Sequence, residues 1–285
     1  MNENSITVCK YNDPTYERMF DYLIQEVFGF SFAPWFERML WDERYESYSI
    51  IQDGIMLSNV CIFKTDMIVS GRKIRAHQFG AIATKEDVRK RGFSRYLIEH
   101  VLSLYPETPA FLSANPSVID FYQRFGFRHV QTYRPRIAAV INNASDKAIK
   151  HSSDDSFIHQ ALYGKRIYSE TVDCLNTQSV QIFNLLMTFK NGIYYLPDCG
   201  AIVVAMQDGI NLFLADVITR NVVSFDEIKA ELPFSGVEFV EFGFCPERLG
   251  IHPHWEKVEM NDEPFFLKGE WGLPEKFCIP SLSTT

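Results

Sequence analysis

The order of apolar and polar positions along the chain predicts a mixed α/β protein. Alternating or short continuous apolar runs bounded by turn residues predict strands, and apolar positions three to four residues apart predict helices. In the first half, strands are expected at 6–11, 48–52, 55–63, 74–84 and 110–113, and the segment 128–140 is expected to contain at least one more. Helices are expected at 16–27, 34–41, 88–104 and 116–125. This order predicts a mixed, mostly antiparallel sheet flanked by helices.

The second half repeats part of this order. Helices are expected at 156–172, 179–189 and 224–232, and strands at 192–207, 210–218 and 237–244. The polar segment 142–155 lies between the two halves and is expected to be a linker. Because domains usually have about 100–150 residues, the 285 residues predict two domains, 1–142 and 143–285, the second a further α/β domain.

Composition and charge exclude several classes of protein. Residues 1–145 hold 17 Lys and Arg against 16 Asp and Glu, and residues 146–285 hold 11 against 20. Neither half has the basic excess that nucleic-acid binding requires, so no nucleic-acid partner is expected. The start is polar and no apolar run approaches the ~18 residues of a membrane span, which predicts a cytoplasmic protein without membrane contact.

The six cysteines predict neither disulfides nor a metal site. They are scattered without a CxxC pair, and no Cys/His cluster has the spacing of a zinc site. A chain with a substantial core does not need a disulfide framework. We therefore expect reduced, mostly buried thiols and no bound metal.

The segment Arg89–Ser94 is the strongest functional signal. It follows a predicted strand and opens a predicted helix, where converging backbone N–H groups and the helix macrodipole favour an anion. Gly92 allows a close approach of the backbone, and the small residues of Gly80–Thr84 leave room for a long, thin ligand beside the strand. Positive charge is added by Arg89, Lys90, Arg91 and Arg95. These features predict a pyrophosphate site; a solvated basic turn and a tightly packed strand are the structural alternatives.

A second element follows about twenty residues later, in the segment 111–127. Asn115 and Pro116 are typical of a helix start, and Gly126 is typical of the position just after a helix end. Tyr122 lies on the predicted helix. Taken alone, these residues are compatible with purely structural roles, Tyr122 as a core aromatic.

Taken together, the two elements resemble the signatures of the GNAT superfamily of N-acetyltransferases. VRKRGFSRYLIE is similar to the family's acetyl-CoA loop, Q/R-x-x-G-x-G/A, and ANPSVIDFYQRFGF resembles its second signature. Both occur in the family's order and spacing, and the likeness covers about residues 74–130, or 5–140 by element order. Ser94 departs from the usual Gly or Ala, and we expect this small residue to be tolerated.

The resemblance implies a role for each position of the two elements. The backbone of Ile82, Ala83 and Thr84 would pair with the pantetheine arm, and the Ile82 N–H would stabilise the oxyanion. Tyr122 would protonate the departing thiolate, since a phenol has a pKa of about 10. The implied cofactor-binding residues are Ile82, Ala83, Thr84, Arg89, Lys90, Arg91, Gly92, Phe93, Ser94, Arg95 and Asn115.

The general base is less well defined. Many relatives carry Glu or His near the position of Gln78, but Gln can only orient a water. His77 is adjacent, yet strand alternation directs it to the other face. The candidates are therefore Gln78 with a water chain, Glu26, and the C-terminal carboxylate of Thr285, since some tandem GNAT enzymes use their chain end.

Two further segments qualify this picture. The aromatic residues of 28–36 lie where GNAT enzymes wall the acceptor pocket, and packing in the core is the alternative. In the second half, Ser224 and Glu227 form an S-x-x-E capping box, and Asp226 adds a further negative charge where a pyrophosphate would sit. This half therefore resembles a degenerate, non-catalytic GNAT-like domain. No motif explains residues 264–285.

These observations predict acetyl transfer from acetyl-CoA, as co-substrate, to the primary amine of a small molecule or peptide. The amine would attack directly in a ternary complex, and the acidic second half would attract a cationic acceptor. Two alternatives remain open: an acyl or aminoacyl transferase with a different donor, and a non-catalytic CoA-binding or regulatory module. The oligomeric state is open, with a homodimer as one option.

Overall fold

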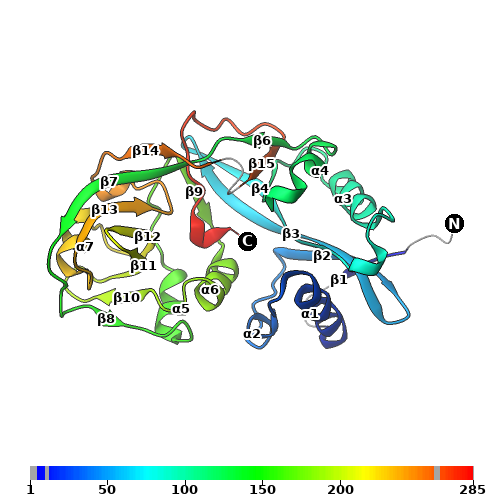
Figure 1. Cartoon of the computed structure of the whole chain (residues 1–285), viewed down its shortest axis with the longest axis horizontal. Helices are drawn as coiled ribbons and strands as arrows, with labels where there is room; N and C mark the ends of the chain where they lie inside the picture. The colour runs from blue at the N-terminus through cyan, green and yellow to red at the C-terminus, as the bar shows by residue number, and fades with distance from the viewer. Residues whose placement is uncertain (1–4, 10–12, 260–263, 285) are drawn as a thin grey trace. The chain divides into compact units, whose positions relative to one another are not determined.

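The computed structural model of the chain describes residues 5–9, 13–259 and 264–284. It divides into two compact units (Figure 1), each assembled from several segments. Unit 1 consists of residues 1–65, 75–130 and 263–270, and unit 2 of residues 66–74, 131–262 and 271–285.

Unit 1 is built on a mixed sheet that is mostly antiparallel. Its strands lie in the order β1 (Ile6–Cys9), β2 (Tyr45–Gln52), β3 (Ile55–Val69), β4 (Arg72–Thr84), β5 (Ala110–Ser113), β15 (Phe265–Lys268) and β6 (Arg128–Val130). The described pairs are antiparallel except for β4 and β5, which run parallel. The parallel step requires a crossover, which is where the candidate site lies.

Helices cover both faces of this sheet (Figure 1). On one face lie α1 (Pro14–Phe28) and α2 (Ala33–Phe36), and on the other lie α3 (Phe93–Leu104) and α4 (Ile119–Gln123). Asp13 caps α1 by accepting hydrogen bonds from the N–H groups of Thr15 and Tyr16, and Gly29 ends it with φ 77°. These are the usual start and stop residues of a helix, and they fix α1 across β2 and β3.

Strand β15 was not expected from the sequence. It comes from the far end of the chain, yet it lies between β5 and β6 and pairs antiparallel with both. The segment 128–140, predicted to contain at least one strand, holds two: β6, in unit 1, and β7 (Tyr133–Ile141), in unit 2. The division into domains 1–142 and 143–285, with the role of each, stays a prediction. The bounds of the two compact units differ from it, because residues 131–142 belong to unit 2 and residues 263–270 belong to unit 1.

Unit 2 contains a second, mostly antiparallel sheet. Its strands lie in the order β14 (His254–Lys257), β7, β13 (Val237–Phe242), β12 (Asn211–Ile218), β11 (Ala201–Asp208), β10 (Ile193–Leu196) and β8 (Ile149–Lys150). The pair β12 and β13 is parallel and is joined by α7 (Phe225–Glu231), which repeats the β4–α3–β5 crossover of unit 1. The fold is thus two GNAT-like α/β units, as predicted.

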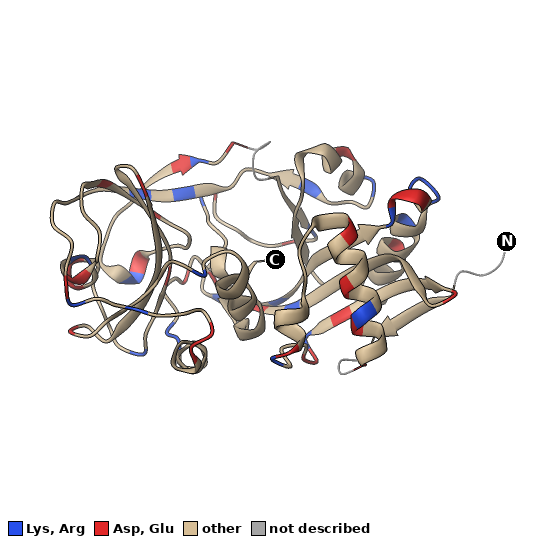
Figure 2. Cartoon of the chain, turned by 60° about the horizontal axis from the view of Figure 1, so that its bottom comes forward, with Lys and Arg blue, Asp and Glu red and all other residues tan. Residues whose placement is uncertain are grey.

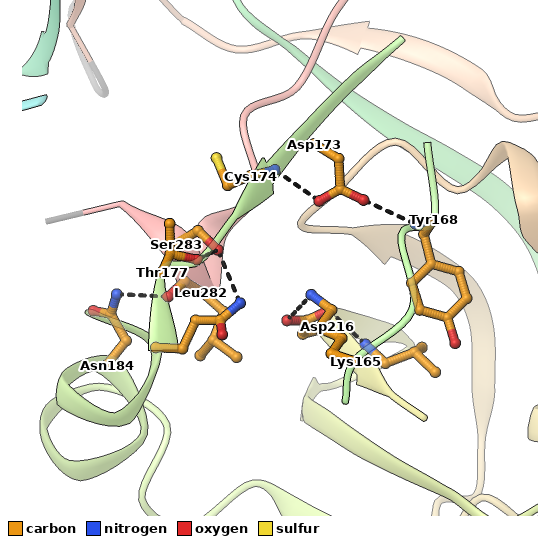
Figure 3. Close-up of polar contacts among 11 residues, drawn as sticks. Lys165, Tyr168, Asp173, Cys174, Thr177, Asn184, Asp216, Leu282 and Ser283 are labelled. Carbon is orange, nitrogen blue, oxygen red and sulfur yellow. Dashed lines mark hydrogen bonds and ion pairs between the residues drawn. The ribbon is translucent and has the colours of Figure 1, made fainter. Parts of the chain in front are cut away.

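Two details of the second half differ from the prediction. The helix expected at 156–172 ends early: α5 spans only Ser156–Leu162, and β9 (Val172–Leu175) follows and pairs with the end of β3. The helix ends next to Gly164, whose N–H donates to the carbonyl of Ala161 at 3.1 Å. Lys165 follows and forms a buried ion pair with Asp216, 2.6 Å away (Figure 3). The segment 142–155, expected to be a linker, contributes the short strand β8.

The end of the chain is fixed within unit 2 (Figure 3). The 3-10 turn η4 (Ser281–Ser283) lies against α6 (Gln178–Met187). Asn184 donates hydrogen bonds to the carbonyls of Leu282 and Thr284 at 3.0 and 2.7 Å.

The ion pair of Lys165 with Asp216 is a second buried polar contact of unit 2. Burial raises the pKa of Asp216, and the adjacent Lys165 opposes that shift. Unit 2 therefore has an organised polar interior of its own.

Candidate active site

The parallel strands β4 and β5 separate part-way along their length. Their described pairing is confined to His77 with Ala110 and Gln78 with Phe111, although β4 continues to Thr84. Three residues beyond the last pair, Ala81 adopts φ 45°, a left-handed conformation that is uncommon for a residue other than Gly. The β5-facing edge of 79–84 thus offers backbone groups that a ligand can pair with.

The loop after β4 leads directly into the start of α3. It forms the 3-10 turn η1 (Glu86–Val88) and then passes through two left-handed residues, Lys90 (φ 65°) and Gly92 (φ 88°). No side chain caps the first turn of α3, and no atom lies within 4 Å of where a Cβ on Gly92 would be. The start of α3 therefore keeps N–H groups available in open space, as an anion site requires.

The loop is rich in exposed cations (Figure 2). They are Arg89, Lys90, Arg91 and Arg95. Arg89 also donates to the carbonyl of Thr84 at 3.3 Å, and Arg95 forms an exposed ion pair with Glu99 at 2.8 Å. Glu86 and Asp87 lie beside them in η1. The cations outnumber these carboxylates and lie next to the open helix start, so the local field favours an anion.

Ser94 has a structural role that the sequence did not reveal. Its hydroxyl lies 2.6 Å from that of Thr84, which in turn lies 2.7 Å from the hydroxyl of Ser58 on β3. The resulting chain of three hydroxyls ties the end of β4 to the first turn of α3. This contact gives a reason for Ser at a position where the similar family usually has Gly or Ala.

Asn115 and Tyr122 lie in the element after β5. Asn115 is exposed at the start of the 3-10 turn η2 (Pro116–Val118), where its Oδ1 accepts a hydrogen bond from the Ser117 N–H at 3.0 Å. This hydrogen bond uses the Oδ1 of Asn115 and does not involve its Nδ2 donors. Tyr122 is buried in α4 against the rings of Phe127 and Phe266, and burial raises its pKa to about 12. The phenol is therefore protonated at neutral pH.

Gln78 and His77 point to opposite faces of the sheet, as predicted. The ring of His77 lies 4.5 Å from that of Tyr105, at the end of α3, and Phe79 belongs to the core under the same helix. Gln78 lies between them on the strand, so its buried side chain faces α1 and α2. Burial lowers the pKa of His77 to about 4, so this imidazole is neutral.

Glu26 lies near the end of β4, where it is paired with a lysine. Its carboxylate forms an ion pair with Lys85, whose Nζ is 2.6 Å away. Both residues line an apolar hollow of about 320 Å³ between α1 and the β2–β3 turn, together with Met19, Tyr22 and Ile55. Glu26 is thus close to the start of the loop that joins β4 to α3. Thr285, the other candidate base, lies outside the described residues.

Two of the five aromatic residues of the segment 28–36 are buried in the core. Phe32 and Trp35 are buried in a network of edge-to-face rings that includes Phe20, with centroid distances of 5.2 to 5.7 Å. Only Phe28 is well exposed, and it stacks on Phe30 at 6.0 Å. The packing alternative therefore holds for the buried rings.

The sequence analysis missed Phe266, which contacts the proposed acid. Phe266 lies on β15, is fully buried, and has its ring centroid 5.6 Å from that of Tyr122. The one signal for it in the sequence is the apolar run Phe265–Leu267. A short apolar run cannot show which strands it will pair with, so its place between β5 and β6 could not be derived.

The corresponding crossover of unit 2 has different chemistry. The capping box at the start of α7 is present in full: Glu227 accepts from the Ser224 N–H at 2.7 Å, and the Glu227 N–H donates to the Ser224 hydroxyl at 3.3 Å. Asp226 lies in the same turn. The donors that an anion would need are used internally, as the sequence predicted.

Comparison with known proteins agrees with this geometry. Residues 9–130 match a family model described as an acetyltransferase (GNAT) domain. No curated protein matches the sequence. The fold is similar to that of a conserved protein of unknown function from Enterococcus faecalis V583, described as "Probable N-Acyltransferase", at a TM-score of 0.59 and 15% identity over 94% of this chain and 73% of that one.

Two further solved structures have the same fold. Eis1 from Mycobacterium abscessus has a TM-score of 0.56 and 14% identity over 93% of this chain and 73% of that one. A GCN5-related N-acetyltransferase from Kribbella flavida has a TM-score of 0.53 and 14% identity over 92% of this chain and 70% of that one. At such identities the likeness establishes the fold alone.

Proposed function

We propose that the chain transfers the acetyl group of acetyl-CoA to a primary amine, because residues 9–130 match a GNAT acetyltransferase domain. The match supports acyltransferase activity in general, and the acetyl-CoA donor and the amine acceptor are our proposal. The amine, on a small molecule or a peptide, attacks the thioester directly while both substrates are bound.

The observation that carries this proposal is the continuous path from the open edge of β4 to the uncapped start of α3. A strand edge that pairs with a ligand backbone suits the pantetheine arm, and the helix start with its cations suits the pyrophosphate. Ile82, Ala83 and Thr84 line the first part of this path, and the loop Arg89–Arg95 lines the second. Asn115 follows β5, and we assign it to contact the arm.

Two groups act on the reacting atoms in this proposal. The N–H of Ile82 donates to the oxyanion that forms when the amine adds to the thioester carbonyl. The Tyr122 hydroxyl gives its proton to the departing sulfur, and its raised pKa ensures that the proton is present beforehand. Acetyl-CoA supplies the activated acyl group.

The proton of the incoming ammonium needs a separate path. We assign Gln78 to orient a water molecule, since its side chain is buried on the α1 and α2 face. Glu26 is the carboxylate proposed to receive the proton. Its ion pair with Lys85 fixes its position beside the end of β4.

Residues 143–285 are proposed to serve as wall and scaffold without an acetyl-CoA site of their own. The filled capping box of α7 supports this role. Among the described residues, no cluster of three or more His, Cys, Asp or Glu side chains could hold a metal ion, and no helix is long and apolar enough to cross a membrane. The cytoplasmic location stays a prediction.

The test is a screen of amines with acetyl-CoA as donor, read as release of the free CoA thiol. The account expects at least one primary amine to give turnover above the rate of acetyl-CoA hydrolysis, and a mass increase of one acetyl group on that amine. Parallel reactions with longer acyl-CoA donors identify a different donor. Turnover with such a donor and none with acetyl-CoA would contradict the proposal.

A further inference from the structure

A row of buried polar side chains crosses the sheet under α1, where apolar residues would be expected. Ser47 and Ser49 lie on β2, Asn59 lies opposite Ser49 on β3, and all three are fully buried. Tyr16 of α1 contacts this row from the helix side and is also buried. Four such groups on one face are costly unless each is hydrogen-bonded, so their contacts must account for their presence.

These side chains form one connected network. The Tyr16 hydroxyl lies 2.7 Å from that of Ser47 and 2.5 Å from that of Ser49. Both serines donate to Oδ1 of Asn59, at 2.6 and 2.7 Å. The position of the Asn59 amide is therefore set from the side of the helix, with its oxygen toward the serines and its nitrogen toward β4.

The nitrogen of Asn59 reaches the candidate active site. Its Nδ2 donates to the carbonyl of Ala81 at 3.0 Å, and to Sγ of Cys61 at 3.1 Å. Asn59 points to the α1 face, so a carbonyl that it reaches must be turned out of the plane of the sheet toward that face. Ala81 is the left-handed residue of β4, with φ 45°. All four hydrogen-bonding positions of the Asn59 amide are thus in use.

We infer that Asn59, oriented by Ser47, Ser49 and Tyr16, is a positioning residue that holds the left-handed turn at Ala81. The Ala81 carbonyl and the N–H of Ile82, the proposed oxyanion donor, belong to the same planar peptide group and point in opposite directions, so fixing the carbonyl also fixes the direction of that donor. A left-handed alanine persists only where its surroundings impose it. This inference rests on the proposed function, because it assigns Asn59 a role in presenting Ile82–Thr84 to acetyl-CoA.

The first test compares two ligands in the variant Asn59→Asp. The titrations are run above the pKa of the introduced carboxyl group, where its ionised form keeps the size of the amide and the acceptor for the serines but has no donor for the Ala81 carbonyl. Acetyl-CoA, which uses both the strand and the loop, is expected to bind about tenfold or more weakly. Adenosine 3′-phosphate 5′-diphosphate lacks the pantetheine arm and uses only the loop, so its affinity should stay within about twofold of the wild type. Calorimetry measures both.

A structural control separates positioning from general damage to the sheet. Thr65 is fully buried farther along β3, and its hydroxyl donates to the carbonyl of Phe63 on the same strand. Thr65→Val is expected to bind both ligands as the wild type does. Hydrogen exchange of the peptide 78–85 in the ligand-free protein should be faster in Asn59→Asp and unchanged in Thr65→Val.

A second pair of variants tests the mechanism through rescue. Asn59→Ala removes the whole amide, and Ala81→Gly removes the conformational cost of φ 45° because Gly adopts it readily. The double variant Asn59→Ala/Ala81→Gly is expected to bind acetyl-CoA at least about threefold more tightly than Asn59→Ala alone. Circular dichroism confirms that each variant is folded.

Three results would overturn the inference: equal weakening of both ligands in Asn59→Asp, unchanged acetyl-CoA affinity in that variant, or no gain from Ala81→Gly. Failure of the proposed function has a different signature, since the wild type itself would then bind no acetyl-CoA. In that case faster exchange of 78–85 in Asn59→Asp would still show that Asn59 holds the strand.

Discussion

Tyr122 is the residue on which the assignment of chemistry depends most. Its ring is packed against Phe121, Phe127 and Phe266, so replacing it by Phe preserves the shape of the core. The account therefore predicts that Tyr122→Phe leaves acetyl-CoA affinity within about twofold and lowers turnover by about 10²–10⁴-fold, the usual contribution of a general acid. Calorimetry and steady-state kinetics measure the two quantities.

The matched control for this substitution is Tyr168 of unit 2. Its hydroxyl is buried without a hydrogen-bond partner among the described residues, so Tyr168→Phe removes nothing that the chemistry uses and should leave turnover unchanged. Turnover that survives in Tyr122→Phe would show that Tyr122 is only a packing residue.

His77 gives the protein a predictable sensitivity to acid. Burial lowers its pKa from the ordinary 6.5 to about 4, so between these values the unfolded chain binds the proton and the folded chain does not. The contribution of the neutral His77 side chain to the free energy of unfolding is therefore fully present above pH 6.5 and is lost as the pH falls toward 4. The expected loss is about 2–3 kcal/mol between pH 7 and pH 4.5.

The measurement is urea unfolding of the wild type and of His77→Gln at both pH values. The variant carries no titrating group at this position, so its free energy of unfolding should fall by about 2–3 kcal/mol less than that of the wild type over the same interval. Equal losses in the two proteins would show that His77 is accessible to protons in the folded state.

Several residues of the site follow from local rules, whereas Asn59 does not. Strand alternation separated His77 from Gln78, and the helix-start preferences of Asn and Ser identified Asn115 and Ser224. The contact of Asn59 depends on the left-handed conformation of Ala81. Alanine carries no sequence signal for that conformation, so the contact could not be predicted.

At the scale of elements, α3 and α7 show how the same crossover can be open or closed to an anion. Gly92 starts α3 without a side-chain cap, whereas Ser224 and Glu227 fill the first turn of α7. This difference was predictable, because capping is decided within four residues of sequence. The early end of α5 was missed although Gly164, a residue type common just after a helix end, lies inside the predicted helix 156–172.

Strand β15 is expected to be essential to unit 1. Phe266 is fully buried between β5 and β6 and contacts His129 and Tyr122. Phe266→Ala should lower the free energy of unfolding by about 3–5 kcal/mol, as for other large core aromatics. Phe157→Ala, at a ring that is 45% exposed, should cost less than about 1 kcal/mol.

Denaturant unfolding followed by tryptophan fluorescence measures both variants. If Phe266→Ala were no more destabilised than Phe157→Ala, β15 would be a peripheral strand and its place between β5 and β6 would be in doubt.

At the scale of the whole molecule, each unit is completed by a segment from elsewhere in the chain. Residues 263–270 belong to unit 1, and residues 66–74 belong to unit 2. The sequence predicted two α/β sheets because their strand and helix patterns are local. It could not predict these exchanges, because strand pairing between distant segments leaves no periodic signal.

The central claim is that one acetyl-CoA binds per chain, on the loop Arg89–Arg95 and the open edge of β4. The site depends on Gly92, whose left-handed backbone faces open space. In Gly92→Asp, a carboxylate would enter the space of the pyrophosphate, and the backbone conformation would be strained. Gly209, in the β11–β12 turn of unit 2, is also left-handed with open space around it, so Gly209→Asp is the matched control.

Calorimetric titration of the full chain with acetyl-CoA tests this claim most directly. The account predicts one binding site per chain in the wild type and in Gly209→Asp, and no detectable binding in Gly92→Asp. Unchanged binding in Gly92→Asp, or two sites per chain in the wild type, would contradict it.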